Sequence, residues 1–252
     1  MRYEAPETKG EAVSLLAMAE GSGRVLAGGT DLLVQLRSGM VKPGVVVDIK
    51  KIVETREITA EHGGFRVGAA VTGAELDEHE ALKKLWPGVV EAVELIGSTQ
   101  VQGRASMGGN LCNASPAADS VPALIAAGAQ CHIAGPDGER TLPVEEFCAG
   151  PGVTNLQTGE FLVSFTLPSR PPHSGDAYLR FIPRTEMDIA VVGVGVSLSL
   201  DSNGICVAAR VGLGAVAATA LLVTEAADAL IGTIVDEGAI ENMTSAIRSA
   251  CR

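Results

Sequence analysis

The 252-residue chain is acidic, with a formal net charge of −11 and only eight aromatic residues, which excludes the basic, aromatic-lined surfaces of nucleic-acid-binding proteins. Its longest apolar run, residues 211–223, is too short to cross a bilayer, and the charged N-terminus MRYEAPETKG lacks the apolar core of a secretion signal, so we expect no membrane insertion. The five cysteines, an odd number without a C-x-x-C pair, fit neither a disulfide framework nor a zinc or iron–sulfur site and indicate a cytoplasmic protein.

The first predicted elements surround a pair of glycines. The spacing of apolar residues predicts a helix over residues 7–19, a short strand over 24–27, a helix over 32–38 and a buried strand over 45–49. Gly28 and Gly29 join the strand at 24–27 to the next helix, for which Thr30 or Asp31 is a good N-cap. A strand that leads through glycines into a helix N-terminus can hold a phosphate. The stretch is neither a P-loop nor a Rossmann fingerprint, because the lysine and the third glycine are missing.

A second glycine pair lies in the stretch Ile96 to Pro122, IGSTQVQGRASMGGNLCNASPAADSVP. A strand over residues 65–70, a short helix over 74–80 and a longer helix over 82–96, interrupted at Pro87, precede it. We expect a long loop in which Gly108 and Gly109 adopt positive φ and offer bare N–H groups to an anionic or polar ligand. The alternative is a long loop that only connects packed elements and binds no ligand.

The remaining chain predicts an α+β arrangement. A helix over residues 120–127 is followed by a hairpin, 130–134 with 139–143, and by a strand over 161–167. The proline-rich segment 169–175 predicts a domain boundary. Beyond it we expect strands over 177–182, 189–200 and 205–213 and helices over 219–230 and 235–251, which together form a separate small unit.

No catalytic residue and no metal ligand set is predicted. The sequence has no G-x-S-x-G, its four histidines are scattered, and its paired acids belong to solvated faces. Cys112 has no neighbouring base, so we expect a small buried residue there rather than a nucleophile. A chain that binds phosphate through backbone amides and lacks acid, base and nucleophile is typical of a cofactor-binding protein.

Three motifs resemble those of a known family. AGGTDLLVQLRSG (27–39) with VVVDIKKI (45–52), SMGGNLCNASPAADSVPAL (106–124) and TEMDIAVV (185–192) are similar to segments of the flavoprotein subunits of molybdenum hydroxylases. These are the medium subunits of carbon monoxide dehydrogenases and of bacterial xanthine, nicotinate and quinoline dehydrogenases. The motifs stand in the family's order and spacing over nearly the whole chain.

The resemblance implies an α+β fold of the vanillyl-alcohol-oxidase (PCMH) type. Two FAD-binding subdomains, residues 1–54 and 55–172, would hold FAD between them, and a small α+β C-terminal domain, residues 173–252, would pack alongside. Because the chain stops at Arg252, earlier than most relatives, we expect the C-terminal domain to be truncated.

The family's cofactor-binding residues can be assigned position by position. Residues of the first segment would contact the pyrophosphate and the ribityl chain of FAD. Residues of the second segment would contact the same groups from the opposite side. Single residues further along the chain would reach the ribityl–phosphate region or the isoalloxazine ring. The residues implied are Ala27, Gly28, Gly29, Thr30, Asp31, Ser106, Gly108, Gly109, Asn110, Asn113, Asp119, Leu162 and Arg180.

The function that the resemblance implies is electron transfer within a complex. A small subunit with [2Fe–2S] clusters and a large molybdopterin subunit would be the partners, and FAD in this chain would pass electrons to an acceptor such as NAD or a quinone. The alternative is a stand-alone flavin oxidoreductase of the same fold that acts directly on a small substrate. A module that binds ADP-like ligands without redox cycling is a third class. The sequence names neither the organic substrate, nor the acceptor, nor the oligomeric state.

Overall fold

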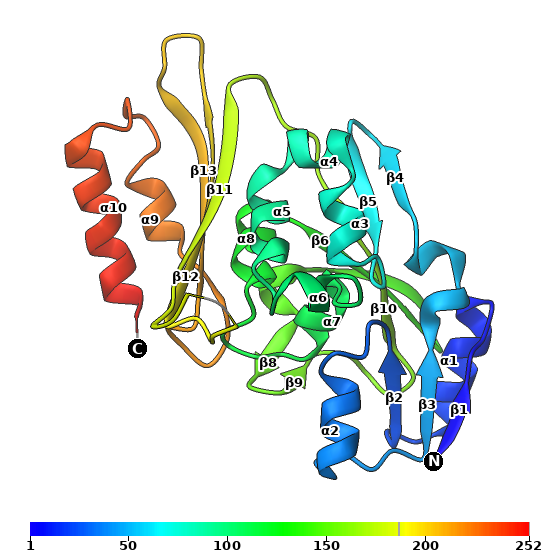
Figure 1. Ribbon diagram of the computed structural model, residues 1–252. Coiled ribbons are helices and arrows are strands. Elements are labelled where there is room, and N and C mark those ends of the chain that lie inside the picture. Colours follow the sequence, from blue (N-terminus) through cyan, green and yellow to red (C-terminus); the bar gives the residue numbers. More distant parts are fainter. Residues whose placement is uncertain (186, 252) are drawn as a thin grey trace.

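The computed structural model describes residues 1–185 and 187–251 and contains three main sheets with helices between and beside them (Figure 1). Glu186, which belongs to the third motif, and Arg252 lie outside the described residues. Within those residues no helix is both long and apolar enough to cross a membrane.

The N-terminal region is a three-stranded parallel sheet. Its strands are β1 (Arg2–Glu4), β3 (Val45–Asp48) and β2 (Gly23–Leu26), in that order. All four residues of the central β3 are buried, which explains its three consecutive valines, and the buried Asp48 accepts hydrogen bonds from Tyr3 and Lys50. Helix α1 (Lys9–Met18) connects β1 to β2, and the Thr8 hydroxyl caps it by accepting a hydrogen bond from the Glu11 amide at 3.2 Å. Helix α2 (Leu32–Ser38) follows β2 and ends at Gly39, which has φ of 74°.

The second sheet has five antiparallel strands with β10 at its centre. Its order is β4 (Ile58–Glu61), β5 (Gly64–Gly68), β10 (Phe161–Leu167), β6 (Gln130–Gly135) and β7 (Gly138–Pro143). Six of the seven residues of β10 are buried, so this strand packs against neighbours on both faces. One face meets α1 and β3 through Phe161 and Val163, while Leu162 and Phe165 belong to the main core on the other face.

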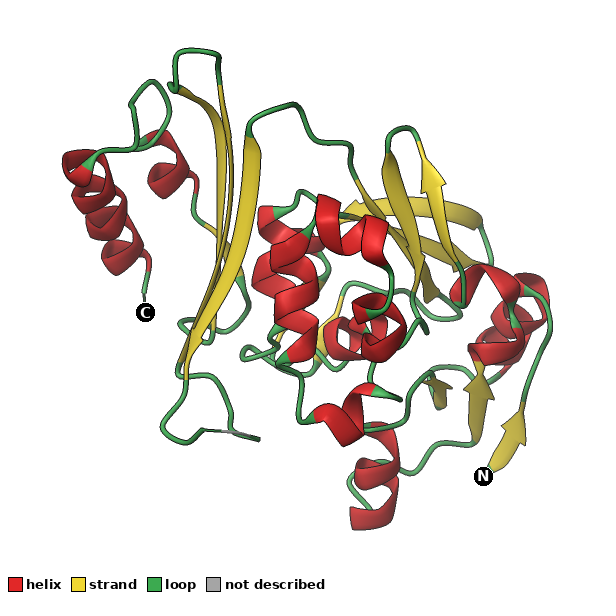
Figure 2. Ribbon diagram, turned by 45° about the horizontal axis from the view of Figure 1, so that its top comes forward, coloured by secondary structure: helices red, strands yellow, loops and turns green. Residues whose placement is uncertain are grey.

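Helices between β5 and β6 supply the main core. They are α3 (Gly73–Asp77), α4 (Glu80–Leu85), α5 (Pro87–Glu94), α6 (Thr99–Gln102), α7 (Met107–Cys112) and α8 (Ser120–Ala126). Figure 2 shows this group of helices between the five-stranded sheet and the last sheet. Helix α8 is buried along its whole length, because it packs against both its helical neighbours and the last sheet.

The C-terminal region is a four-stranded antiparallel sheet covered on both faces. Its strands are β11 (Ser174–Phe181), β12 (Val192–Leu200), β13 (Cys206–Gly214) and β14 (Leu221–Leu222). Helices α5 and α8 cover one face, and α9 (Thr224–Asp228) with α10 (Glu237–Ala250) lie on the other (Figure 1). The short strands β8 (Cys148–Gly150) and β9 (Val153–Thr154) form a separate pair, and the 3₁₀ turns are η1 (Ile49–Lys51), η2 (Val53–Thr55) and η3 (Val144–Glu146).

Several predicted elements are confirmed. Helix α2 and strand β10 have the predicted bounds, the β6–β7 hairpin forms as expected, and the predicted strands after residue 173 and the last helix appear with shifted ends. The helix predicted over residues 219–230 is wrong in its first part, because residues 221–222 pair with β13 as strand β14 and the helix covers only residues 224–228. The predicted helix over residues 82–96 is divided at Trp86, because Pro87 starts a new helix as its first residue.

Two expectations about the stretch Ile96 to Pro122 are wrong. The stretch is not a long loop, since it contains α6 and α7 and reaches the start of α8. Gly108 and Gly109 do not have positive φ, because they occupy the first turn of α7. The helix forms despite its two glycines because Ser106 caps it and because Met107 and Leu111 are buried in the core.

Candidate functional site

A cavity of about 620 Å³ lies between the N-terminal sheet and the helices of the second region. Most of its lining comes from three separate parts of the chain, residues 21–41, 105–113 and 152–162, and Leu16, Ile49, Ala69 and Ile96 complete it. Among the predicted site residues, all but Asp119 and Arg180 line it: Ala27, Gly28, Gly29, Thr30, Asp31, Ser106, Gly108, Gly109, Asn110, Asn113 and Leu162. A cavity of this size is typical of a small-molecule or cofactor site.

The first wall is the turn between β2 and α2. Gly29 has φ of 82°, so the turn takes a conformation that favours glycine. Within the described part of the chain, the N–H groups of Thr30, Asp31 and Leu32 have no hydrogen-bond acceptor. Asp31 is the N-cap of α2 by position, but its carboxylate makes no capping hydrogen bond, and burial raises the pKa of that carboxyl. The wall therefore offers unpaired donors beside one acidic group.

The second wall is the start of α7. The Ser106 hydroxyl accepts a hydrogen bond from the Gly109 amide at 3.1 Å, and the Asn110 amide donates to the Ser106 carbonyl. The Thr72–Ser106 β-bridge directs the Met107 N–H to the sheet side, whereas the Gly108 N–H has no acceptor in the part of the chain that the structure describes. One backbone donor thus remains for a ligand on this side as well.

The glycines of the two pairs have different roles. A Cβ at Gly28 would lie 1.8 Å from the Arg104 carbonyl oxygen, and a Cβ at Gly108 would lie 2.3 Å from the Ala69 carbonyl oxygen. Both glycines therefore allow two segments of the protein to approach each other. A Cβ at Gly109 would meet only the Ser106 hydroxyl, at 3.3 Å, so Gly109 is the glycine of the second pair whose open side faces the cavity.

A side-chain hydrogen bond connects the first two walls. The Gln35 Nε2 atom on α2 donates to Asn113 Oδ1 at the end of α7, at 3.0 Å. Helix α2 has no buried residue, and glycines with positive φ stand at both of its ends, Gly29 and Gly39. The Gln35–Asn113 bond therefore holds a thinly packed helix beside the cavity.

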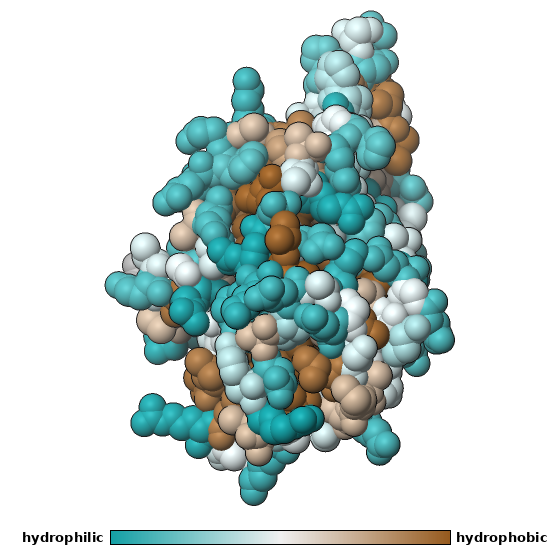
Figure 3. All heavy atoms as spheres, turned by 90° about the vertical axis from the view of Figure 1, so that its right-hand side faces the viewer, coloured by the Kyte–Doolittle hydropathy of each residue, from teal (hydrophilic) through white to brown (hydrophobic). Residues whose placement is uncertain are grey.

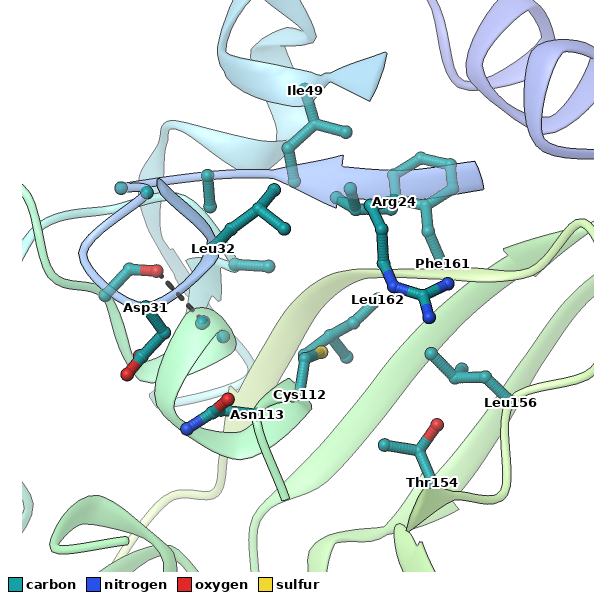
Figure 4. A pocket seen from close by; sticks show the side chains of 18 of the residues that line it. Arg24, Asp31, Leu32, Ile49, Cys112, Asn113, Thr154, Leu156, Phe161 and Leu162 are labelled. Carbon is teal, nitrogen blue, oxygen red and sulfur yellow. Dashed lines mark hydrogen bonds between the residues drawn. The ribbon is translucent and has the colours of Figure 1, made fainter. Parts of the chain in front are cut away.

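Of the residues in the third wall, only Leu162 was predicted from the sequence. This wall consists of Thr154, Leu156, Gln157, Thr158 and Glu160 before β10, followed by Phe161 and Leu162 at the start of that strand. Figure 4 shows Thr154, Leu156, Phe161 and Leu162 on the side of the cavity opposite Asp31. Arg140 forms two hydrogen bonds to Glu160 and lowers the pKa of its carboxyl. The available signal in the sequence was the polar run over residues 154–160 before a buried strand.

Cys112 lines the cavity, and the expectation of a buried residue is wrong because its side chain is exposed. Protein atoms nevertheless surround it on its other sides, and this burial raises the pKa of the thiol to about 12. The thiolate is therefore scarce at neutral pH. In the described part of the chain, the cavity lining contains no histidine, lysine or tyrosine.

Asp119 and Arg180 lie outside the lining and contact each other. Arg180 Nη1 donates to Asp119 Oδ2 at 2.9 Å, and the Tyr178 hydroxyl donates to Asp119 Oδ1 at 3.1 Å. Burial raises the pKa of the Asp119 carboxyl, while Arg180 and Tyr178 oppose part of that rise. The cluster connects the start of α8 to β11, and through them the second region to the C-terminal sheet.

Two family descriptions match the chain and together cover most of it. The family described as "FAD binding domain in molybdopterin dehydrogenase" matches residues 1–170. The family described as "CO dehydrogenase flavoprotein C-terminal domain" matches residues 177–252.

Individual relatives show the same similarity. The xanthine dehydrogenase FAD-binding subunit of Escherichia coli O157:H7 is 35% identical over 219 residues, which are 86% of this chain and 74% of that protein. The carbon monoxide dehydrogenase medium chain of Hydrogenophaga pseudoflava is 30% identical over 249 residues, which are 99% of this chain and 86% of that protein.

Solved structures have the same fold. A chain of the reconstituted CO dehydrogenase from Oligotropha carboxidovorans superposes with a TM-score of 0.95 at 29% identity, and one of quinoline 2-oxidoreductase from Pseudomonas putida 86 with 0.89 at 29%. Each superposition covers 100% of this chain and 87% of the other. The predicted α+β fold, an FAD-binding region followed by a small C-terminal domain, is confirmed.

Proposed function

The chain belongs to the family of FAD-binding subunits of molybdopterin dehydrogenases, and from this premise we propose that it receives electrons from [2Fe–2S] clusters of a partner subunit and delivers them through FAD to an external acceptor. Membership makes it an oxidoreductase subunit that binds FAD. The proposed partners are a small iron–sulfur subunit and a large molybdopterin subunit, with NAD or a quinone as acceptor, in the cytoplasm.

The observation that carries the proposal is the open side of Gly109 beside unpaired backbone donors. Two walls of the cavity present N–H groups without acceptors, and the absent Gly109 side chain leaves room where they meet the cavity. Backbone N–H groups that converge on one space are suited to a diphosphate, which FAD carries at its centre. The residues present therefore fit this cofactor, whose isoalloxazine ring supplies the electron transfer when it is bound.

The proposed FAD ligands are the eleven predicted residues that line the cavity. For Asp119 and Arg180 a direct contact with FAD stays a prediction, since their side chains bind each other outside the lining. We assign residues 1–54 and 55–172 to two FAD-binding subdomains and residues 173–252 to the C-terminal domain. The three sheets support this division, because each lies within one of these ranges.

The stand-alone oxidoreductase has less support. Such an enzyme needs a group that takes a proton from its substrate, and the described lining offers no histidine, lysine or tyrosine for this. Asp31 and Glu160 are its acidic residues, and Glu160 is already paired with Arg140.

The proposal is tested by purifying the chain with the proteins that accompany it and recording a visible spectrum. We expect flavin bands together with a broad iron–sulfur absorption and two further polypeptides, and acid release of FAD rather than FMN. A colourless chain that FAD does not reconstitute would contradict FAD binding. Flavin alone, reduced directly by a small substrate, would favour the stand-alone enzyme.

A further inference from the structure

The cavity lining carries a single basic side chain. Among its residues in the described part of the chain, Arg24 is the only lysine or arginine. The acidic groups are Asp31 and Glu160, and Arg140 already balances Glu160 through hydrogen bonds of 2.7 and 2.8 Å. A diphosphate that enters a protein of net charge −11 therefore meets one side-chain cation in this lining.

Arg24 has free donors that face the cavity. Figure 4 shows its guanidinium group extending from β2 toward the space between Leu156 and Leu162. Its Nη1 atom donates to the carbonyl oxygens of Gly23 at 2.9 Å and Gly21 at 3.4 Å, which orients the group. Within the described residues, Nε and Nη2 have no acceptor, and no carboxylate forms an ion pair with Arg24. Three N–H donors of the guanidinium fork thus remain for a ligand.

We infer that Arg24 binds the diphosphate of the cofactor and sets the preference of this cavity for diphosphate-bearing ligands, an inference that rests on the proposed function. Arg24 is an exposed residue of β2, the strand that leads into the glycine turn, and precedes Gly28 by four residues. An unpaired planar guanidinium suits two phosphate oxygens better than a backbone amide does, since it adds both charge and paired donors.

The test compares ligands with and without phosphate. The flavin-free chain is titrated with FAD, ADP, adenosine and riboflavin by calorimetry. We expect Arg24→Gln to weaken the binding of FAD and ADP by about 10- to 100-fold, which is the range for a lost hydrogen bond to a charged group. The affinities for adenosine and riboflavin should stay unchanged. Arg24→Lys should lose less affinity for FAD and ADP, because lysine keeps the positive charge but lacks the planar set of guanidinium donors. The affinity of Arg24→Gln for FAD should also fall less steeply with salt.

Arg37→Gln is the matched control, since it removes an equal charge from an exposed residue of α2 outside the lining. FAD affinity equal to wild type in Arg24→Gln would overturn the inference. An equal loss of affinity for adenosine and ADP in Arg24→Gln would show that Arg24 contacts the adenine base, and would overturn its proposed phosphate contact. An equal loss for all four ligands, with a lower unfolding temperature of the ligand-free variant, would overturn it in favour of a structural role. Wild-type protein that binds no FAD would instead contradict the proposed function itself.

Discussion

Arg180 donates a hydrogen bond of 2.9 Å to Asp119, and the two side chains are only 7% and 12% exposed. The pair joins β11 of the C-terminal sheet to the residue that precedes α8. A nearly buried charge pair is costly to break on one side, because the remaining charge has no counterion.

Arg180→Met should therefore lower the free energy of unfolding by about 3–5 kcal/mol, since it leaves the Asp119 carboxylate with the Tyr178 hydroxyl alone. Urea unfolding followed by the fluorescence of Trp86, the single tryptophan, measures the change. The control is Arg184→Met, which breaks an ion pair whose arginine is 71% exposed and should cost no more than about 1 kcal/mol. Equal losses in both variants would contradict the importance of the buried pair.

The two glycines of α7 should respond in opposite ways to an added side chain. Gly108→Ala should destabilise the fold, because its Cβ would lie 2.3 Å from the Ala69 carbonyl oxygen. Gly109→Val should leave a folded protein that no longer retains FAD, since its side chain would project into the cavity. Thermal unfolding of the flavin-free variants and the flavin content after gel filtration separate the two effects. Stoichiometric flavin in Gly109→Val would remove this glycine from the proposed site.

His132 should make stability depend on pH. Burial lowers the pKa of this imidazole, the nearby Arg66 lowers it further, and Glu61 and Glu139 oppose the shift. The folded protein therefore binds the proton less readily than the unfolded chain. The resulting stability is present above the ordinary histidine pKa of about 6.5 and is lost as the pH falls toward the lowered value.

Urea midpoints of wild type and His132→Gln between pH 8 and pH 5 check this expectation. The variant keeps a hydrogen-bonding group near Thr166, whose hydroxyl lies 2.7 Å from His132 Nε2. The wild-type midpoint should fall more steeply with decreasing pH than that of the variant. Parallel curves would show that His132 does not contribute.

Cys112 should react slowly although it is exposed. With a pKa of about 12, roughly one thiol in ten thousand is ionised at pH 8. Alkylation by iodoacetamide, followed by mass spectrometry, should label exposed Cys251 well before Cys112. Bound FAD should slow the labelling of Cys112 further and leave Cys251 unchanged. If FAD protects both cysteines or neither, Cys112 does not line the cofactor site.

Elements with a strong local signal could be predicted from the sequence. Helix α2 has a glycine at each end and β10 is a buried apolar run, so both were found with their bounds. Strand β4 was missed because its burial does not alternate clearly, and β1 because two of its three residues are exposed. Helix α7 was taken for a loop since glycine disfavours helix, whereas Ser106 and the buried Met107 and Leu111 stabilise it.

The candidate site divides in a similar way. Glycine pairs marked the first two walls, although the missing side chains of Gly28 and Gly108 make room for other segments of the protein and not for a ligand. The third wall carries no such pair, and Arg24 is a single cation in a strand, which no spacing pattern distinguishes from a surface residue. Only the folded arrangement brings these residues to one cavity. On the face that includes α1 and β4, hydrophilic side chains surround smaller groups of hydrophobic ones (Figure 3).

The central position of β10 has a consequence for the order of events during synthesis. This strand pairs with β5 and β6, yet it is the last of the five strands to leave the ribosome. Until residue 167 has emerged, β5 and β6 have no strand between them and the third wall of the cavity does not exist. The nascent chain therefore cannot form the complete site early, and the cofactor must be loaded after about two-thirds of the polypeptide has been made.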